Sequence, residues 1–156
     1  MCAEPLFEES LALLRAQGDT ANVARSLFNL GAVALMLGRP GEAHARFRES
    51  LTLGRTAGDK EDLAWCLLGF AGLAAASSEG ERASQLLGTA VALLEAMGAT
   101  FKPFERHLHD TARDQARLLC GDDGFEEARR RGAATSLDDA IEEAMSGEVG
   151  PRITAV

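Results

Sequence analysis

Apolar and small residues recur along the chain in similar blocks, with a period of about 40 residues. Within each block these residues follow the three- and four-residue spacing of one helix face, and polar, glycine-containing segments separate the blocks. The shift aligns Glu9-Ser10-Leu11 with Glu49-Ser50-Leu51, and Gly18 with Gly58 and Gly98. Further matches are Ala3 with Ala43 and Ala83, Phe7 with Phe47 and Leu87, Leu13 with Leu53 and Leu93, Ala24 with Ala64, Leu27 with Leu67, Leu30 with Phe70, and Gly31 with Ala71. Such a period predicts helix pairs that bury their apolar stripes by stacking.

Residues at the block boundaries predict where the helices begin and end. Asp19 and Asp59 are expected to cap the helices that follow them. Gly38 is expected to end one helix and Pro40 to open the next. Ser78 is expected to cap the following helix. Each unit is therefore predicted to be helix, tight turn, helix and longer turn.

The predicted fold class is all-α, an antiparallel helix-pair solenoid in a single domain of residues 1–146. A half repeat at 4–17 precedes a repeat at 20–57 and a second at 60–97. Capping helices are expected over 100–146. The last residues, 147–156, contain two Gly and one Pro without an apolar stripe, which predicts a disordered tail.

The C-terminal third departs from the repeating pattern. Thr100 is expected to cap a helix that tolerates Pro103 in its first turn. Two short helices are predicted near 122–131 and 137–146, and Ser136 is expected to cap the second. The new apolar stripe of this third consists of Phe101, Phe104, Leu108, Ala112 and Leu119.

The half repeat carries an apolar stripe of Phe7, Leu11 and Leu14 that this pattern leaves without a partner. Two interpretations remain open. The chain is a fragment of a longer array, or a neighbouring molecule covers the stripe, which would make the protein a homodimer.

Composition and charge further limit the fold class, the kind of ligand and the compartment that we expect. The chain is 46% hydrophobic and 5% aromatic, rich in Ala and Leu, which favours helix over sheet. A net charge of -8 argues against direct nucleic-acid binding, because an acidic surface repels phosphates. The sequence contains neither a long apolar run nor a secretory signal, so we expect no membrane segment and a cytoplasmic protein. Cys66 and Cys120 are interpreted as small core residues of a reducing compartment.

The stretch from Ala24 to Arg55 resembles a tetratricopeptide repeat through Leu30-Gly31, Gly38, Ala43, Phe47 and Ser50-Leu51, and 64–91 resembles a weaker second copy. The resemblance implies an array whose first helices line a concave groove that binds a protein or peptide segment. It places these groove residues toward the partner: Arg25, Phe28, Leu35, Met36, Trp65, Leu68 and Leu108. Other residues expected on the same face are Ala32, Gly72, Ala75, Ala76, Glu105, Ala112 and Gln115.

The end of the chain carries a second resemblance. The strings 86–90, 93–98 and 125–128, with Gly132, Ser136-Leu137 and Ala140-Ile141, look like the last repeats of LuxR-type and antibiotic-pathway regulators of bacteria. This resemblance implies a transcriptional regulator or signalling protein in which the array senses or docks another domain. Neither a helix-turn-helix nor a phosphate loop is present in the sequence, so those activities are not carried over.

Candidate chemistry is sparse. His107 and His109 are two residues apart on a predicted helix, so they face nearly opposite sides and suit no metal site. Sequential acidic pairs such as Glu61-Asp62 are interpreted as solvated surface. Gly31, Gly69 and Gly72 are interpreted as packing positions within helices rather than a phosphate loop. We therefore expect no enzyme, no cofactor and no metal.

The leading hypothesis is a non-catalytic interaction or sensor module that binds a partner segment in its groove. The alternatives are a small-molecule effector sensor, with an apolar ligand held by Phe28, Met36, Trp65 and Leu68, and a homo-oligomerisation module.

Overall fold

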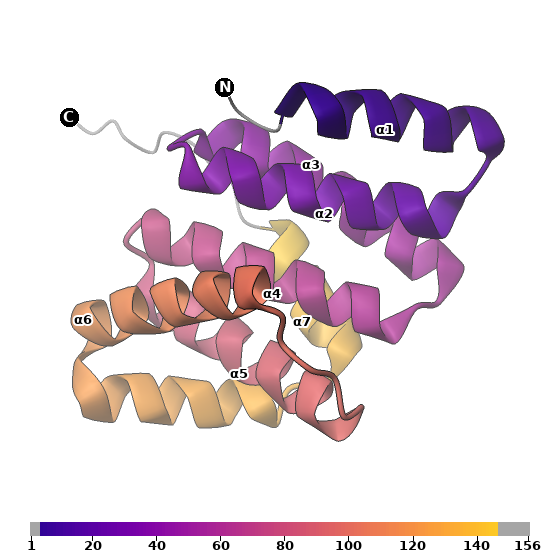
Figure 1. The fold of residues 1–156 in the computed structure, drawn as a ribbon. Helices are drawn as coiled ribbons and strands as arrows, with labels where there is room; N and C mark the ends of the chain where they lie inside the picture. Colours follow the sequence, from indigo (N-terminus) through magenta and orange to yellow (C-terminus); the bar gives the residue numbers. More distant parts are fainter. Residues whose placement is uncertain (1–3, 147–156) are drawn as a thin grey trace.

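The computed structural model describes residues 4–146, apart from the side chains of residues 4, 5 and 7. The predicted tail at 147–156 lies outside the described residues. The described part consists of helices joined by short turns and contains no strand, which confirms the predicted all-α fold class (Figure 1). Every helix in this part is too short or too polar to span a membrane.

Helices α1 to α5 follow one another as antiparallel neighbours, whereas α7 packs against α4 and α5 (Figure 1). The bounds of the helices are α1 Glu4–Gln17, α2 Thr20–Met36, α3 Pro40–Ala57, α4 Lys60–Ala76, α5 Gly80–Ala96, α6 Pro103–Ala133 and α7 Leu137–Ser146.

The first five helices end in the same turn, and these turns are evenly spaced along the chain. A residue with a left-handed backbone follows each helix, and the amide after it donates to a carbonyl five residues earlier, as Arg39 does to Ala34 at 2.8 Å. Asp19 and Asp59 cap α2 and α4 through their carboxylates, and Ser136 caps α7, as predicted. The left-handed residues are Gly18, Gly38, Gly58, Ser78 and Gly98.

Ser78 is the non-glycine residue among these left-handed positions, and the prediction that it caps α5 is wrong. It is not the cap of α5, because Glu79 occupies the N-cap position and Ser78 has φ 64. A side chain at this φ costs about 1 kcal/mol, because its Cβ crowds the backbone. The periodicity in fact places Ser78 where the other four turns have glycine.

Replacing Ser78 with glycine is expected to stabilise the protein by about 1 kcal/mol, because the strain at the turn is relieved. Urea denaturation measures the change. The reciprocal variant Gly38→Ser is expected to lose a similar amount, since Gly38 has φ 74 and nothing within 4 Å of an added Cβ. A loss of stability in Ser78→Gly would show that the Ser78 hydroxyl contributes more to the stability of the protein than relief of the backbone strain does.

Helix α6 consists of two helical halves separated by Gly121, whose φ of 77 and ψ of 164 are not helical. The second half agrees with the predicted helix near 122–131. The predicted cap is wrong: Lys102, not Thr100, is the N-cap residue, with Pro103 at the start of the helix. The first half of α6 runs beside α4, and the second half turns back beside α5 (Figure 1).

Glycines bring the second half of α6 against α5. A Cβ on Gly88 would overlap the carbonyl of Arg129, and a Cβ on Gly132 would overlap the carbonyl of Gln85. At the same crossing the Thr89 hydroxyl donates to the carbonyl of Gly132 at 2.5 Å. The two backbones are therefore in direct contact.

The core of the first full repeat is centred on Phe47 of α3. Its ring is fully buried between α2 and α4, where an added Cβ on Gly31 would lie 2.6 Å from a ring carbon and one on Gly69 would lie 2.7 Å away. The interpretation of these glycines as packing positions is confirmed.

Two residues of the stripe that the sequence leaves without a partner, Leu11 and Leu14, are covered within the chain, and the side chain of Phe7 lies outside the described part. Leu11 of α1 is buried against Val23, Leu27 and Leu30 of α2, with Leu14 packed beside them. The outer side of α1 is exposed, with Leu6 at 70% and Leu13 at 61%. The unpartnered surface of α1 is therefore its outer face rather than the Leu11 stripe.

Candidate functional site: a groove on helix α4

The groove lies between α2 and the first half of α6, and α4 forms its floor. α4 is almost entirely buried from Asp62 to Ala75, because α2, α3, α5 and α6 all pack against it. Two cavities open along the groove. We call them the Arg25 cavity, near the start of α2, and the Met36 cavity, near its end.

The Arg25 cavity has a volume of about 330 Å³ and combines aromatic with charged side chains. Aromatic rings come from all three helices that form the groove: Phe28 from α2, Trp65 from α4 and Phe104 from α6. The complete lining is Ala24, Arg25, Phe28, Asn29, Ser50, Asp62, Trp65, Lys102, Phe104 and Glu105.

Asp62 is the buried charge of this cavity. Only 7% of the residue is exposed, and one carboxylate oxygen accepts from the guanidinium of Arg25 at 3.1 Å. Burial raises the pKa of the Asp62 carboxyl above its ordinary value, the nearby Asp59 adds to the rise, and Arg25 opposes it. The Asp62–Arg25 contact thus joins α4 to α2, and burying the Asp62 carboxylate costs desolvation free energy. Buried charges of this kind are often found at functional sites.

The interpretation of Glu61-Asp62 as solvated surface is therefore wrong for Asp62. Asp62 lies in the first turn of α4, where Asp59 accepts from its backbone amide at 3.1 Å. That position turns its side chain toward α2 and Arg25 rather than toward solvent. Glu61 is exposed, and its carboxylate accepts from the indole nitrogen of Trp65 at 3.3 Å.

The raised pKa gives the stability a defined pH dependence. The folded protein holds the Asp62 proton more tightly than the unfolded chain, so this contribution is largest below the ordinary pKa of 3.8 and is lost as the pH rises through the raised value. Asp62→Asn removes the penalty yet keeps an acceptor for Arg25. The variant is therefore expected to be at least as stable as the wild type at pH 7, with an advantage that shrinks as the pH falls.

Urea denaturation at several pH values measures this advantage, with the exposed Asp123→Asn as control. A clear loss of stability in Asp62→Asn at pH 7 would contradict the prediction, because it would make the ionised pair net stabilising.

The Met36 cavity, of about 240 Å³, is apolar on its floor and polar along its α6 side. Small residues of α4 form the floor, and Met36 at its edge is 47% exposed. The lining is Leu35, Met36, Gly72, Ala75, Ala76, His107, Leu108, Thr111, Ala112 and Gln115.

The structure places six of the seven predicted groove residues at these cavities. Arg25, Phe28 and Trp65 line the first, and Leu35, Met36 and Leu108 line the second. Leu68 lines neither and is fully buried beneath them. Partner contact by these residues stays a prediction.

The expected open apolar surface is, however, mostly filled. Phe28, Trp65, Leu68 and Leu108 are all buried, because the first half of α6 and the segment before it pack onto α4. Trp65 is 5% exposed and meets the ring of Phe101 edge-on at 5.2 Å between centroids. Trp65 is thus a core aromatic that also forms a cavity wall.

Sequence reasoning missed Asn29, Lys102 and Phe104, as well as Asp62, in the Arg25 cavity. Asn29 follows Arg25 by four residues, so the shared helix face is visible in the sequence. The approach of Lys102 and Phe104 depends on how α6 returns across α4, which no local pattern indicates.

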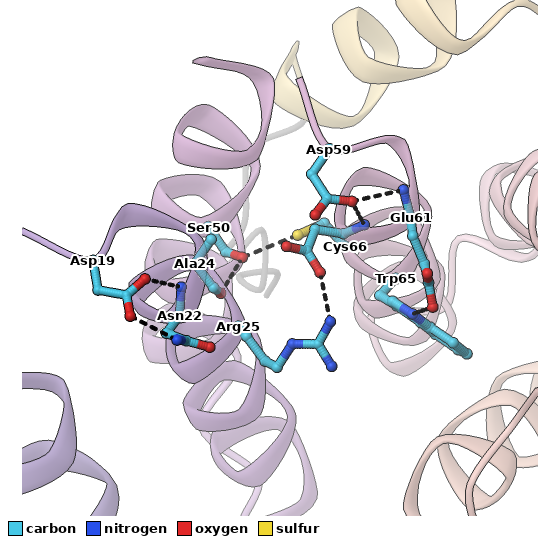
Figure 2. Close-up of polar contacts among 10 residues, drawn as sticks. Asp19, Asn22, Ala24, Arg25, Ser50, Asp59, Glu61, Trp65 and Cys66 are labelled. Atoms are coloured by element: carbon cyan, nitrogen blue, oxygen red, sulfur yellow. Dashed lines mark hydrogen bonds and ion pairs between the residues drawn. The ribbon is translucent and has the colours of Figure 1, made fainter. Parts of the chain in front are cut away.

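At the wall of the Arg25 cavity, a buried polar chain joins three helices. Figure 2 shows Ser50 between Ala24 and Cys66, with its hydroxyl donating to the Ala24 carbonyl at 2.6 Å and lying 3.1 Å from the Cys66 sulfur. Burial raises the pKa of the Cys66 thiol to about 12, so the thiol stays protonated at neutral pH. Cys66 is a packing residue, as predicted.

The fold and the groove define a class of protein: an α-helical repeat array with a groove along one face. A family model described as tetratricopeptide repeat matches residues 3–56, which covers α1, α2 and nearly all of α3. This match supports the resemblance seen in the sequence, and tetratricopeptide repeats generally mediate protein–protein interaction. Searches of curated proteins and of solved structures found no match.

Proposed function

We propose that this chain is a non-catalytic interaction module that binds a segment of a partner protein in the groove between α2 and α6. The observation that carries the proposal is the pair of cavities on α4, one partly charged and one with an apolar floor, aligned along a single groove. Two anchor points on a rigid floor suit a peptide segment that inserts one side chain into each.

The finer setting rests on the resemblance of residues 80–146 to the helical arrays of bacterial regulators. In that setting the bound segment would belong to another domain of the same regulator. Binding would then couple the state of that domain to the exposure of the groove.

A selection of random peptides on the immobilised protein tests the proposal. Ala76→Arg places a charge at the edge of the Met36 cavity, where Ala76 is exposed, so the fold is expected to persist. The selected peptides are expected to bind this variant at least about tenfold more weakly, because a bulky charge fills the apolar anchor site. Fluorescence polarisation of the labelled peptides measures the change.

Leu13→Arg provides the matched control, because it adds the same charge to the exposed face of α1 outside the groove. It is expected to leave peptide binding unchanged. If Leu13→Arg weakens binding and Ala76→Arg does not, the outer face of α1 is the binding surface and the groove assignment is wrong.

A second candidate function, self-assembly, is favoured by the exposed Leu6 and Leu13 on the outer face of α1. Their separation of seven residues places them on one side of the helix. Light scattering over a wide concentration range tests it. A dimer that Leu13→Arg converts to monomer would support this function, and a monomer at every concentration would exclude it.

A further inference from the structure

The acidic groups of the Arg25 cavity are already engaged by the protein. The carboxylate of Asp62 accepts from Arg25. A carboxylate oxygen of Glu105 accepts from the backbone amide of Lys102 at 3.0 Å, which closes the first turn of α6. Asp62 is also buried, so among the two acids only the half-buried Glu105 keeps acceptor sites near the surface of the cavity.

The donors of the same cavity are largely available. Arg25 uses one of its five N–H groups on Asp62, and its side chain is about half exposed. Among the described residues, no hydrogen bond involves the carboxamide of Asn29 and no ion pair involves the ammonium of Lys102. The cavity thus presents a cationic and amide rim above aromatic walls.

Arg25 is also held in place before any ligand arrives. Figure 2 shows the Arg25 side chain extending from α2 toward α4, and one guanidinium nitrogen donates to the Asp62 carboxylate at 3.1 Å. A guanidinium oriented by a buried carboxylate loses little freedom when it binds a second carboxylate. Asn29, one helical turn further along α2, lines the same cavity.

We infer that the Arg25 cavity anchors an acidic side chain of the partner segment, with Arg25 and Asn29 binding its carboxylate and the aromatic walls contacting an apolar neighbour. Lys102 contributes a second cation from the start of α6. This inference rests on the proposed function and adds the chemistry of one anchor residue to it.

The position of the second cavity indicates why the carboxylate belongs to a side chain within a segment. Arg25 and Leu35 are separated by about 15 Å along α2, at the ordinary helical rise of about 1.5 Å per residue. A segment that also fills the Met36 cavity must continue along the groove past the Arg25 cavity. The expected partner therefore carries an acidic residue and a bulky apolar residue separated by that same span of the groove.

Two blocked dipeptides test the inference directly: acetyl-Glu-Phe-amide and its neutral isostere acetyl-Gln-Phe-amide. Binding to the full chain labelled with nitrogen-15 is followed at the side-chain amide of Asn29 and the indole N–H of Trp65, which both lie at the cavity. The Glu probe is expected to bind about tenfold more tightly than the Gln probe, as one charge-assisted contact predicts.

Arg25→Gln is expected to abolish the preference, and the exposed Arg55→Gln, which keeps the same change of charge, is expected to retain it. Asn29→Asp is the second variant, because it should keep the fold and repel the probe even if the loss of Arg25 destabilises the protein. Equal binding of the two probes, no binding of either, or a preference that survives both cavity variants would overturn the inference. Displacement of the Glu probe by millimolar inorganic phosphate would overturn it in favour of a phosphate site.

The two proposals fail in different ways. If selected peptides bind and Ala76→Arg weakens them while the dipeptides show no preference, the groove function stands and the acidic anchor is wrong. If neither experiment shows binding, both are wrong.

Discussion

Gly132→Ala is expected to be about 3 kcal/mol less stable than the wild type, a loss at the upper end for overpacking. The added methyl would overlap the carbonyl of Gln85, and backbone atoms cannot move aside as a side chain can. Either α5 and α6 separate or the Thr89 bond to Gly132 breaks. Thermal denaturation should show a midpoint lower by roughly 10 °C for a domain of this size.

Gly124→Ala is the matched control in the same half of α6. An added Cβ there meets only the Cβ of Cys120, at 3.4 Å, so alanine should add up to about 1 kcal/mol through its better helix propensity. The same substitution, eight residues apart, is thus expected to have opposite signs. Equal effects at both positions would contradict the direct backbone contact between α5 and α6.

Phe47→Ala is expected to lose about 4 kcal/mol, because it empties the space that the ring fills between α2 and α4. Gly31→Ala should lose about 2 kcal/mol by pushing a methyl against the same ring, which Gly69 confines from the other side. Urea denaturation measures both losses. The exposed Gly41→Ala, with nothing within 4 Å, should cause little change.

The second repeat indicates how the side chains at positions 31 and 47 can compensate for each other in size. At the equivalent places it has Ala71 and Leu87, both buried. Combining Gly31→Ala with Phe47→Leu is therefore expected to be less harmful than the sum of the single changes, by about 1 to 2 kcal/mol. Additive losses would mean that the methyl and the ring do not compete for the same space.

The positions of the helices can be predicted from the sequence because the signals for them are local. A capping carboxylate such as Asp59, a left-handed glycine such as Gly38 and a proline such as Pro40 each act within one turn of backbone. Ser78 is misleading because serine is common both as a cap and in turns. Only the even spacing of the turns distinguishes these roles.

The candidate site can be predicted only in part. The periodicity places Arg25 and Met36 on one face of α2, but it does not show that Trp65 and Leu68 are covered. α6 covers these two side chains, and the sequence of α6 no longer follows the 40-residue period. The burial of Asp62 likewise depends on Arg25, 37 residues away in the sequence, and such pairings require the assembled structure.

The spacing of the left-handed residues limits how such an array can lengthen. They are evenly spaced from Gly18 to Gly98, and the next described residue with a positive φ is Gly121, which lies three residues past the position that the same spacing would give and has an extended ψ of 164. The three additional residues lie in the loop at 99–102 before α6, and at Gly121 the backbone has a ψ of 164 and turns α6 back along α5 instead of starting another stacked pair. Duplication of whole helix pairs before Gly98 is therefore expected to continue the even spacing of the turns. The same duplication after Gly121 would not continue it. Lengthened relatives of this protein should differ by complete helix pairs inserted before the position equivalent to Gly98.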